Sequence, residues 1–264
     1  MGYQRFITPD TKPFDPLELA KETERITCQG DKRKYTAFYS VPVYRGIATG
    51  YAVGCCLRCY YCWSDQSRDF PEAYGHFYSP SQVFMALSQA VKEGIKYGPP
   101  AWRGLPIRRL RLSGCEPTIG KEHLLSLMEW VEPSEFPLFI LETNGILFGA
   151  DRDYVPRLAK FSKLHVRVSL KAGTPEGFTK RTGAMGDSYE LPFKALEHLL
   201  QARISCHAAA MTDPRVMMAE ERAMLIRKLG GINQDLARNL EEEKIDPYET
   251  TKERLKAAKV AIRW

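Results

Sequence analysis

Hydrophobic and polar positions alternate along the chain with two different periods, which predicts strands and helices in turn. Apolar residues at every second position, or in a short unbroken run, are typical of strands, and spacings of three and four are typical of amphipathic helices. Strands are expected at residues 46–53, 107–114, 137–145, 164–173, 203–211 and, as a weak last strand, 240–246. Helices are expected at residues 79–98, 121–131, 151–161, 175–181, 189–202, 218–229 and 249–259.

The helix over 79–98 has its own start and stop residues. Ser79 or Ser81 can accept hydrogen bonds from the free N–H groups of the first turn. Gly98, followed by Pro99 and Pro100, is expected to end the helix, because proline cannot continue it.

Strand–helix alternation of this kind favours a parallel sheet with helices outside it. The pattern contains five or six β/α units, fewer than the eight of a closed barrel. We therefore expect an α/β fold, a partial (β/α)6 TIM-type barrel that is open on one side. Residues 1–45 are expected to be an N-terminal extension with a short helix near 16–25, residues 46–215 the core barrel, and residues 216–264 a C-terminal segment that closes it.

Composition adds limits on class and location. The chain has 264 residues, of which 44% are hydrophobic and 27% charged, enough for one domain with a sizeable core. No apolar run approaches a membrane span, and the first residues lack the apolar stretch of a signal peptide, so we expect a cytoplasmic monomer without a membrane partner. The net charge is +6, with basic residues at 32–34 and 103–111; we favour a solvated surface there over a site for an anionic partner.

Polar residues gather where successive strands end. They are the cysteines of the loop after 46–53, Gly114–Pro117, Glu142–Gly145, Ser169–Lys171 and, within the fifth strand, Cys206 and His207. Because the carboxyl ends of parallel strands meet at one end of a barrel, these residues are expected to form a single site.

The cysteine loop has the spacing C-x3-C-x2-C, formed by Cys55, Cys59 and Cys62. Three thiolates at this spacing can bind three irons of a 4Fe-4S cluster and leave the fourth iron open. Two alternatives remain: a zinc site, which would need a fourth ligand that the sequence does not offer nearby, and a frame that uses Cys56 in place of Cys55. A disulfide framework is disfavoured, because the chain has an odd number of cysteines, seven, and no signal peptide.

This spacing, with Tyr61 just before the last cysteine, resembles the cluster motif of the radical S-adenosylmethionine (radical SAM) superfamily. The resemblance implies a 4Fe-4S cluster and SAM as cofactors, with the open iron binding the amino and carboxylate groups of SAM. It also implies that the reduced cluster cleaves SAM to methionine and a 5′-deoxyadenosyl radical. An electron donor such as flavodoxin or ferredoxin and a low-oxygen setting are expected with it.

Further segments resemble family motifs. Gly114-Cys115-Glu116 is similar to the family's Gly-Gly-Glu, which implies that it holds the methionyl amine of SAM, although Cys115 replaces the second glycine. Glu142–Gly145 and Ser169–Lys171 resemble strand ends of the subfamily around pyruvate formate-lyase activating enzyme. This implies that Asn144, Ser169 and Lys171 line the ribose and methionine side of SAM, and that Tyr61 presents its backbone to the adenine.

Other positions are less defined. Ser169 stands where those relatives have an aspartate that helps to hold a monovalent cation. His207, beside three alanines, suits a cofactor pocket or a core position equally, and Arg181 either faces substrate or caps a helix.

We thus expect an enzyme of the radical SAM class that abstracts hydrogen from a macromolecular substrate. A glycyl-radical enzyme is the first candidate, although Ser64 replaces the Asn or His common in its activases. RNA and a small anionic metabolite are alternative substrates. A non-catalytic iron–sulfur or zinc-binding protein is the alternative of another class.

Overall fold

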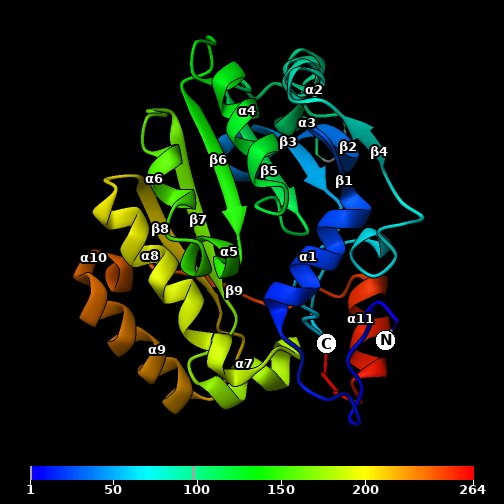
Figure 1. Cartoon of the computed structure of the whole chain (residues 1–264), viewed down its shortest axis with the longest axis vertical. Coiled ribbons are helices and arrows are strands. Elements are labelled where there is room, and N and C mark those ends of the chain that lie inside the picture. Colours follow the sequence, from blue (N-terminus) through cyan, green and yellow to red (C-terminus); the bar gives the residue numbers. More distant parts are fainter. Residues whose placement is uncertain (1, 97–98) are drawn as a thin grey trace.

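The computed structural model describes residues 2–96 and 99–264. The strands form one sheet, and helices cover its outer side (Figure 1). The strands are β1 Cys28–Gln29, β2 Lys32–Val41, β3 Ile47–Ala52, β4 His76–Tyr78, β5 Arg109–Gly114, β6 Leu138–Thr143, β7 Leu164–Leu170, β8 Ser205–Met211 and β9 Glu241–Glu243. The helices are α1 Pro16–Thr27, α2 Pro80–Glu93, α3 Pro100–Arg103, α4 Lys121–Val131, α5 Ile146–Ala150, α6 Tyr154–Leu158, α7 Pro175–Thr182, α8 Leu191–Gln201, α9 Ala219–Ile232, α10 Gln234–Arg238 and α11 Glu249–Ala257, with short 3-10 turns η1 Val43–Arg45, η2 Gln66–Arg68 and η3 Gly186–Glu190.

The sheet has the order β1-β2-β3-β5-β6-β7-β8-β9, with β4 beside β2. All neighbours from β3 to β9 are parallel, whereas β2 runs antiparallel to β3. Within the described ranges β1 and β9 stand at opposite ends of the pairing order, so the barrel stays open. This confirms the predicted partial barrel with six parallel strands.

Alternation within the strands separates an apolar outer face from a polar inner face. On β5, Leu110 and Leu112 are fully buried beneath the helices, while Arg111 and Ser113 line a pocket on the inner side. On β7, Val168 packs outward and Arg167 points inward in the same way. A closed barrel of this type fills its interior with branched apolar side chains. The polar interior here marks a site rather than a core.

Helix α2 confirms the predicted start and corrects the predicted end. The Ser79 hydroxyl accepts from the Gln82 N–H, and the Gln82 side chain accepts from the Ser79 N–H, which makes a capping box. The helix ends at Glu93, because Gly94 adopts φ +67°, a left-handed conformation that stops it. The prediction that it continues to Gly98 was wrong, and Gly98 itself lies outside the described residues.

The segment 1–45 contains more than the expected helix. Helix α1 is present, but the ten-residue strand β2 was not predicted. A bulge between Tyr35 and Ala37 shifts its register, so the apolar alternation that marks a strand is broken. The sheet therefore takes strands from all three of the segments proposed from the sequence, since β2 and β9 lie outside residues 46–215.

The expected solvated basic surface is found at Lys32, Arg103 and Arg108, which are exposed, but Arg33, Lys34 and Arg111 are buried. Arg33 is fully buried, and its guanidinium donates to the carbonyls of Val53 and Glu116. Arg111 is 8% exposed and pairs with Glu142 at 2.8 Å. Much of the positive charge therefore stabilises the fold from inside.

Across the described ranges, we find no helix with the length and apolar character that a bilayer crossing needs.

Candidate active site

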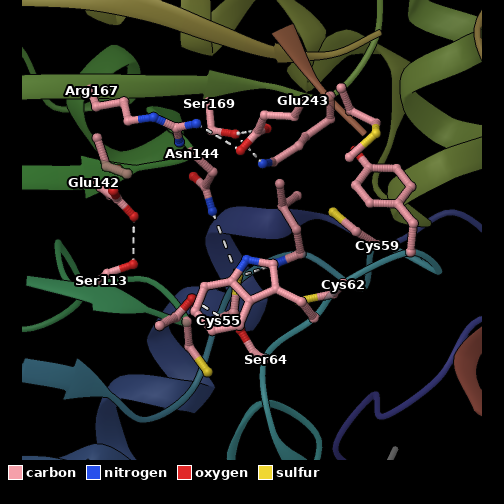
Figure 2. A pocket seen from close by; sticks show the side chains of 18 of the residues that line it. Cys55, Cys59, Cys62, Ser64, Ser113, Glu142, Asn144, Arg167, Ser169 and Glu243 are labelled. Carbon is pink, nitrogen blue, oxygen red and sulfur yellow. Dashed lines mark hydrogen bonds and ion pairs between the residues drawn. The ribbon is translucent and has the colours of Figure 1, made fainter. Parts of the chain in front are cut away.

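A pocket of about 600 Å³ lies at the carboxyl ends of the parallel strands (Figure 2). Its walls come from the cysteine loop after β3, from the ends of β5, β6, β7 and β8, and from β9. The volume falls within the usual range of ligand pockets, roughly 300–1,000 Å³. The cysteine loop and the polar ends of β5, β6 and β7 therefore meet in one place, as predicted, whereas Cys206 and His207 of β8 do not line the pocket.

Most of the predicted site residues line this pocket. They are Cys55, Cys59, Tyr61, Cys62, Gly114, Cys115, Asn144, Ser169 and Lys171. Glu116, Arg181 and His207 do not line it.

The cysteine thiols occupy one side of the pocket, with Arg167, Ser169 and Glu243 on another (Figure 2). Cys55 and Cys59 are buried, and Cys62 is half-buried. Cys56 is fully buried behind the wall, where its thiol meets the Asn144 amide at 3.3 Å. The frame with Cys55 therefore faces the pocket, and the frame with Cys56 does not.

The thiol pKa values reflect this setting. Burial raises the pKa of Cys59 to about 12. The Cys56 thiol, by hydrogen bonding, lowers the pKa of Cys55 to about 7. An ionised Cys59 thus needs a compensating cation, which a bound metal centre supplies.

Three buried arginines hold the backbone of the cysteine loop, a feature that the sequence analysis missed. Each donates from its guanidinium to the carbonyl of one pocket cysteine. The pairs are Arg58 with Cys55 at 2.7 Å, Arg68 with Cys59 at 2.6 Å and Arg254 with Cys62 at 2.7 Å. All three side chains are at most 2% exposed. Arg68 also lines the pocket, whereas Arg58 and Arg254 lie outside its lining, so the loop is held from more than one side.

The end of β5 brings backbone groups close to the loop. Gly114 adopts φ +96°, and a Cβ there would meet the backbone N and O of Ala52 at 3.1 Å, so glycine is required. The Ser64 hydroxyl donates to the Gly114 carbonyl at 2.9 Å. Cys115, in the position of the family's second glycine, donates its N–H to the Ala52 carbonyl. This edge keeps its backbone pairing despite the extra side chain.

Glu116 is fully buried and joins two strand ends rather than facing the pocket. Its carboxylate accepts from the N–H and hydroxyl of Thr118 at 3.1 and 2.6 Å, from the Thr143 hydroxyl at 2.7 Å and from the Asn144 N–H at 2.7 Å. The predicted contact of Glu116 with the amine of SAM therefore has no direct route, and the residue acts here by placing Asn144.

Lys171, Ser169 and Glu243 form a polar chain on the wall of the pocket. The Lys171 ammonium donates to the Ser169 hydroxyl at 2.6 Å, which donates to Glu243 at 3.0 Å. Burial raises the pKa of Glu243, but the Arg167 charge prevails and holds it below the usual value. The three glutamates of β9 were not predicted as site residues. A run of charged residues in a C-terminal segment does not indicate that one of the side chains faces the pocket.

The inner floor of the pocket is ionic. Arg111 pairs with Glu142 at 2.8 Å, and Glu142 also accepts from Ser113 (Figure 2). Arg167 pairs with Glu241 at 2.9 Å and with Glu243 at 2.7 Å. These charges lie in the pocket wall and can meet a polar ligand.

His207 and Arg181 have partners outside the pocket wall. The His207 ring lies 2.7 Å from the His165 ring nitrogen and 3.0 Å from the Glu241 carboxylate. Arg181 pairs with Glu221 at 2.7 Å and is 3% exposed. Their contacts account for both residues without a cofactor, so the cofactor role of His207 stays a prediction.

The site suits an iron–sulfur cluster with SAM better than a single metal ion. Among residues 2–96 and 99–264, no group of three or more His, Cys, Asp or Glu side chains could hold one metal ion. A cluster needs no such group, since each thiolate binds a different iron. The buried Tyr61 hydroxyl has no partner within the described chain, although it sits in the pocket wall. A buried polar atom of this kind normally has a partner, which a bound ligand would supply.

Comparison with known proteins agrees with this chemistry. The model of the radical SAM superfamily matches residues 51–229. No curated protein matches the chain.

Similar solved structures share the fold at low identity. Streptococcus suis SuiB bound to the precursor peptide SuiA has a TM-score of 0.57 at 16% identity, over 83% of this chain and 42% of SuiB. TYW1 with a lysine-pyruvate adduct has a TM-score of 0.51 at 16% identity, over 75% of this chain and 64% of TYW1. The anSMEcpe structure with AdoMet and the Cp18Cys peptide has a TM-score of 0.50 at 16% identity, over 73% of this chain and 48% of that protein.

The chain spans less than two thirds of each of these proteins, so they inform the fold alone. The superfamily match covers more than half of the chain and includes most of the pocket. The chain therefore belongs to the radical SAM superfamily, whose members are enzymes that use a 4Fe-4S cluster and SAM.

Proposed function

We propose that this enzyme cleaves SAM reductively and abstracts a hydrogen atom from a protein substrate. Cys55, Cys59 and Cys62 would hold the cluster, because only this frame of the motif faces the pocket. When bound, the reduced cluster supplies the electron that cleaves SAM to methionine and a 5′-deoxyadenosyl radical. The single observation that carries the proposal is that the three thiols of the motif share one pocket with polar residues of four strands, β5, β6, β7 and β9.

The remaining pocket residues would bind and orient SAM. Lys171 offers an ammonium for the carboxylate, and Ser169 holds that ammonium in place. The Asn144 amide and the Tyr61 hydroxyl offer hydrogen bonds to the sugar and base. Glu116 positions Asn144 from behind through its backbone N–H.

The exposed residues of the pocket lining mark its mouth. They are Val43 at 46% and Trp63 at 45% on one rim, and Glu241, Glu242, Lys244 and Asp246 on the other. An aromatic row leads to this mouth across β2 and β3. Tyr39 stacks on Tyr51 with ring centroids 4.6 Å apart, and Tyr51 meets Trp63 edge-on at 6.3 Å.

This row favours a bulky substrate, because Tyr39 is 40% exposed and lies beyond the pocket lining. A small metabolite enclosed in the pocket would not contact the Tyr39 ring. Exposed aromatic side chains beside a functional site commonly mark interaction surfaces.

Protein is favoured over RNA by the charges. Arg103 and Arg108 are exposed, but neither lines the pocket, and Arg111, which does, is paired with Glu142. The rim opposite the aromatic row carries Glu241, Glu242 and Asp246 against one lysine, Lys244, so its charge repels phosphate. Two of the similar structures, SuiB and anSMEcpe, were solved with bound peptides, which adds support. A glycyl-radical enzyme remains the first candidate within this class.

Hydrogen transfer from a deuterated lysate tests the proposal. Reconstituted enzyme, dithionite and unlabelled SAM are incubated with the dialysed macromolecular fraction of a perdeuterated lysate of the source organism. Deuterium should appear in 5′-deoxyadenosine, and protease treatment of the fraction should abolish it. Loss after ribonuclease instead would favour RNA, and transfer from the small-molecule fraction alone would refute a macromolecular substrate.

Exposed-surface variants sharpen this test. Tyr39→Ala should lower deuterium transfer from the protein fraction several-fold and leave SAM cleavage without substrate unchanged. Trp130→Ala is the matched control, since Trp130 is 51% exposed on α4, away from the pocket lining. Equal transfer by Tyr39→Ala and the parent would remove the aromatic row from the proposal.

A further inference from the structure

The three arginines around the cysteine loop have an arrangement that loop packing alone does not require. Arg58 comes from the loop itself, Arg68 from η2 and Arg254 from α11, near the other end of the chain. Each nevertheless donates to the carbonyl of a different pocket cysteine. Each cysteine of the C-x3-C-x2-C motif has such a contact, whereas the carbonyls of Cys56 and Cys115 have none in the described chain.

Their charges are only partly balanced by the protein. Arg68 and Arg254 share one carboxylate, Asp69, which is fully buried, with contacts of 2.6 Å to each. Arg58 makes no ion pair within residues 2–96 and 99–264; it donates to backbone carbonyls and lies over the Tyr3 ring, 4.9 Å from its centroid. Three guanidinium charges and one carboxylate charge leave two positive charges buried around the loop.

A buried positive excess is costly unless an anion lies near it. One Arg58 nitrogen, Nη2, is buried and has no hydrogen-bond partner in the described chain, which adds to this cost. The three thiolates that hold a cluster are anions on the same residues whose carbonyls the arginines contact. The excess positive charge therefore points to a negatively charged group at the cysteines.

We propose that Arg58, Arg68 and Arg254 form a cationic cradle that positions the three cysteines and raises the midpoint potential of the cluster. A positive charge in a buried setting favours the reduced, more negative form of the cluster. The cradle therefore makes the electron from an external reductant easier to accept. This inference rests on the proposed function only in requiring that the loop holds a cluster.

Arg254 is the residue to change, because Arg58 lies inside the motif and Arg68 contacts the next residue, Asp69. Arg254→Gln removes the charge and keeps a hydrogen-bond donor, whereas Arg254→Lys keeps the charge. The control is Arg33→Gln, another fully buried arginine, which donates to the carbonyls of Val53 and Glu116 and to the Cys28 sulfur, but to none of the three loop cysteines.

Midpoint potentials are measured anaerobically by dithionite titration followed by electron paramagnetic resonance, with iron content and apo-protein melting recorded for every variant. Arg254→Gln should shift the reduction equilibrium at least tenfold towards the oxidised cluster, about 59 mV for one electron. Arg254→Lys and Arg33→Gln should stay close to the parent. A purely structural role would change melting and iron content but not the potential.

Two results would overturn the cradle. One is an Arg254→Gln protein with full iron and the potential of the parent. If Arg254→Gln does not hold iron, the iron content of the two variants is compared instead, and Arg254→Lys should retain clearly more iron than Arg254→Gln. The second overturning result is equal loss of iron in both variants, because the charge of residue 254 would then have no effect on the cluster. Neither result depends on SAM cleavage by the parent protein. A failure of the cradle proposal can therefore be distinguished from a failure of the proposed function.

Discussion

Glu116→Gln is the most informative single change for the geometry of the site. The carboxylate joins the ends of β5 and β6, and one oxygen accepts three hydrogen bonds while the other accepts the Asn144 N–H at 2.7 Å. Glutamine keeps the shape, and its carbonyl oxygen can keep the three bonds. Its amide nitrogen then faces the Asn144 N–H, so one charged hydrogen bond becomes two opposed donors in a fully buried position.

The magnitude follows from these contacts. A hydrogen bond to a charged group contributes about 1.5–3 kcal/mol, and an unpaired buried donor costs about 1–3 kcal/mol, so the free energy of unfolding should fall by about 3–5 kcal/mol. For a domain of this size the melting temperature should fall on the order of 10 °C. The SAM dissociation constant should rise as well, because Asn144 loses its anchor.

Thermal unfolding of the iron-free protein and equilibrium dialysis with SAM measure the two effects. Glu122→Gln is the matched control, since Glu122 is exposed and paired only with Arg157. Exposed ion pairs contribute little, so this control should melt with the parent. A Glu116→Gln protein that melts with the parent would refute the account of how the strand ends are joined.

Further predictions concern the cluster, the ligand and pH. Cys59→Ala should abolish a stable four-iron cluster and Cys56→Ala should keep it, as iron and sulfide analysis will show; full iron in Cys59→Ala would sink the ligand assignment. Tyr61→Phe should leave the melting temperature unchanged or higher, because it removes a buried hydroxyl without a partner, yet bind SAM more weakly by calorimetry; unchanged affinity would withdraw Tyr61 as a SAM contact. The Arg215 hydrogen bond lowers the pKa of Asp213 to about 2, so this carboxylate stabilises the fold above its unfolded pKa and loses that effect as pH falls towards 2. Urea denaturation should show a smaller loss of stability between pH 4 and pH 2 in Asp213→Asn than in the parent, and equal losses would contradict the pKa.

The sequence was sufficient for the main architecture because each core strand follows a simple pattern. Leu110 and Leu112 alternate with Arg111 and Ser113, and the structure buries one set outside and the other inside the barrel. Strand β2 escaped prediction, since its bulge breaks the alternation. Helix α10 is a single short turn with almost no periodic signal.

Site prediction was best where the motif and strand ends agreed. Cys55, Asn144 and Lys171 all reach the pocket. The contact predicted for Glu116 could not be checked from the sequence, because a family motif does not reveal that its carboxylate accepts hydrogen bonds from neighbouring residues. The role of Arg254 could not be predicted either, since nothing in a charged C-terminal helix predicts a contact with a loop almost two hundred residues away.

The central claim is that the three-thiol pocket carries an open cluster that cleaves SAM. The most direct test is anaerobic reconstitution with iron and sulfide, reduction with dithionite and assay of SAM products. The account predicts close to four irons per chain and formation of methionine and 5′-deoxyadenosine in equal amounts, lost in Cys59→Ala. A protein that holds four irons and binds SAM, but forms no 5′-deoxyadenosine on reduction, would contradict it.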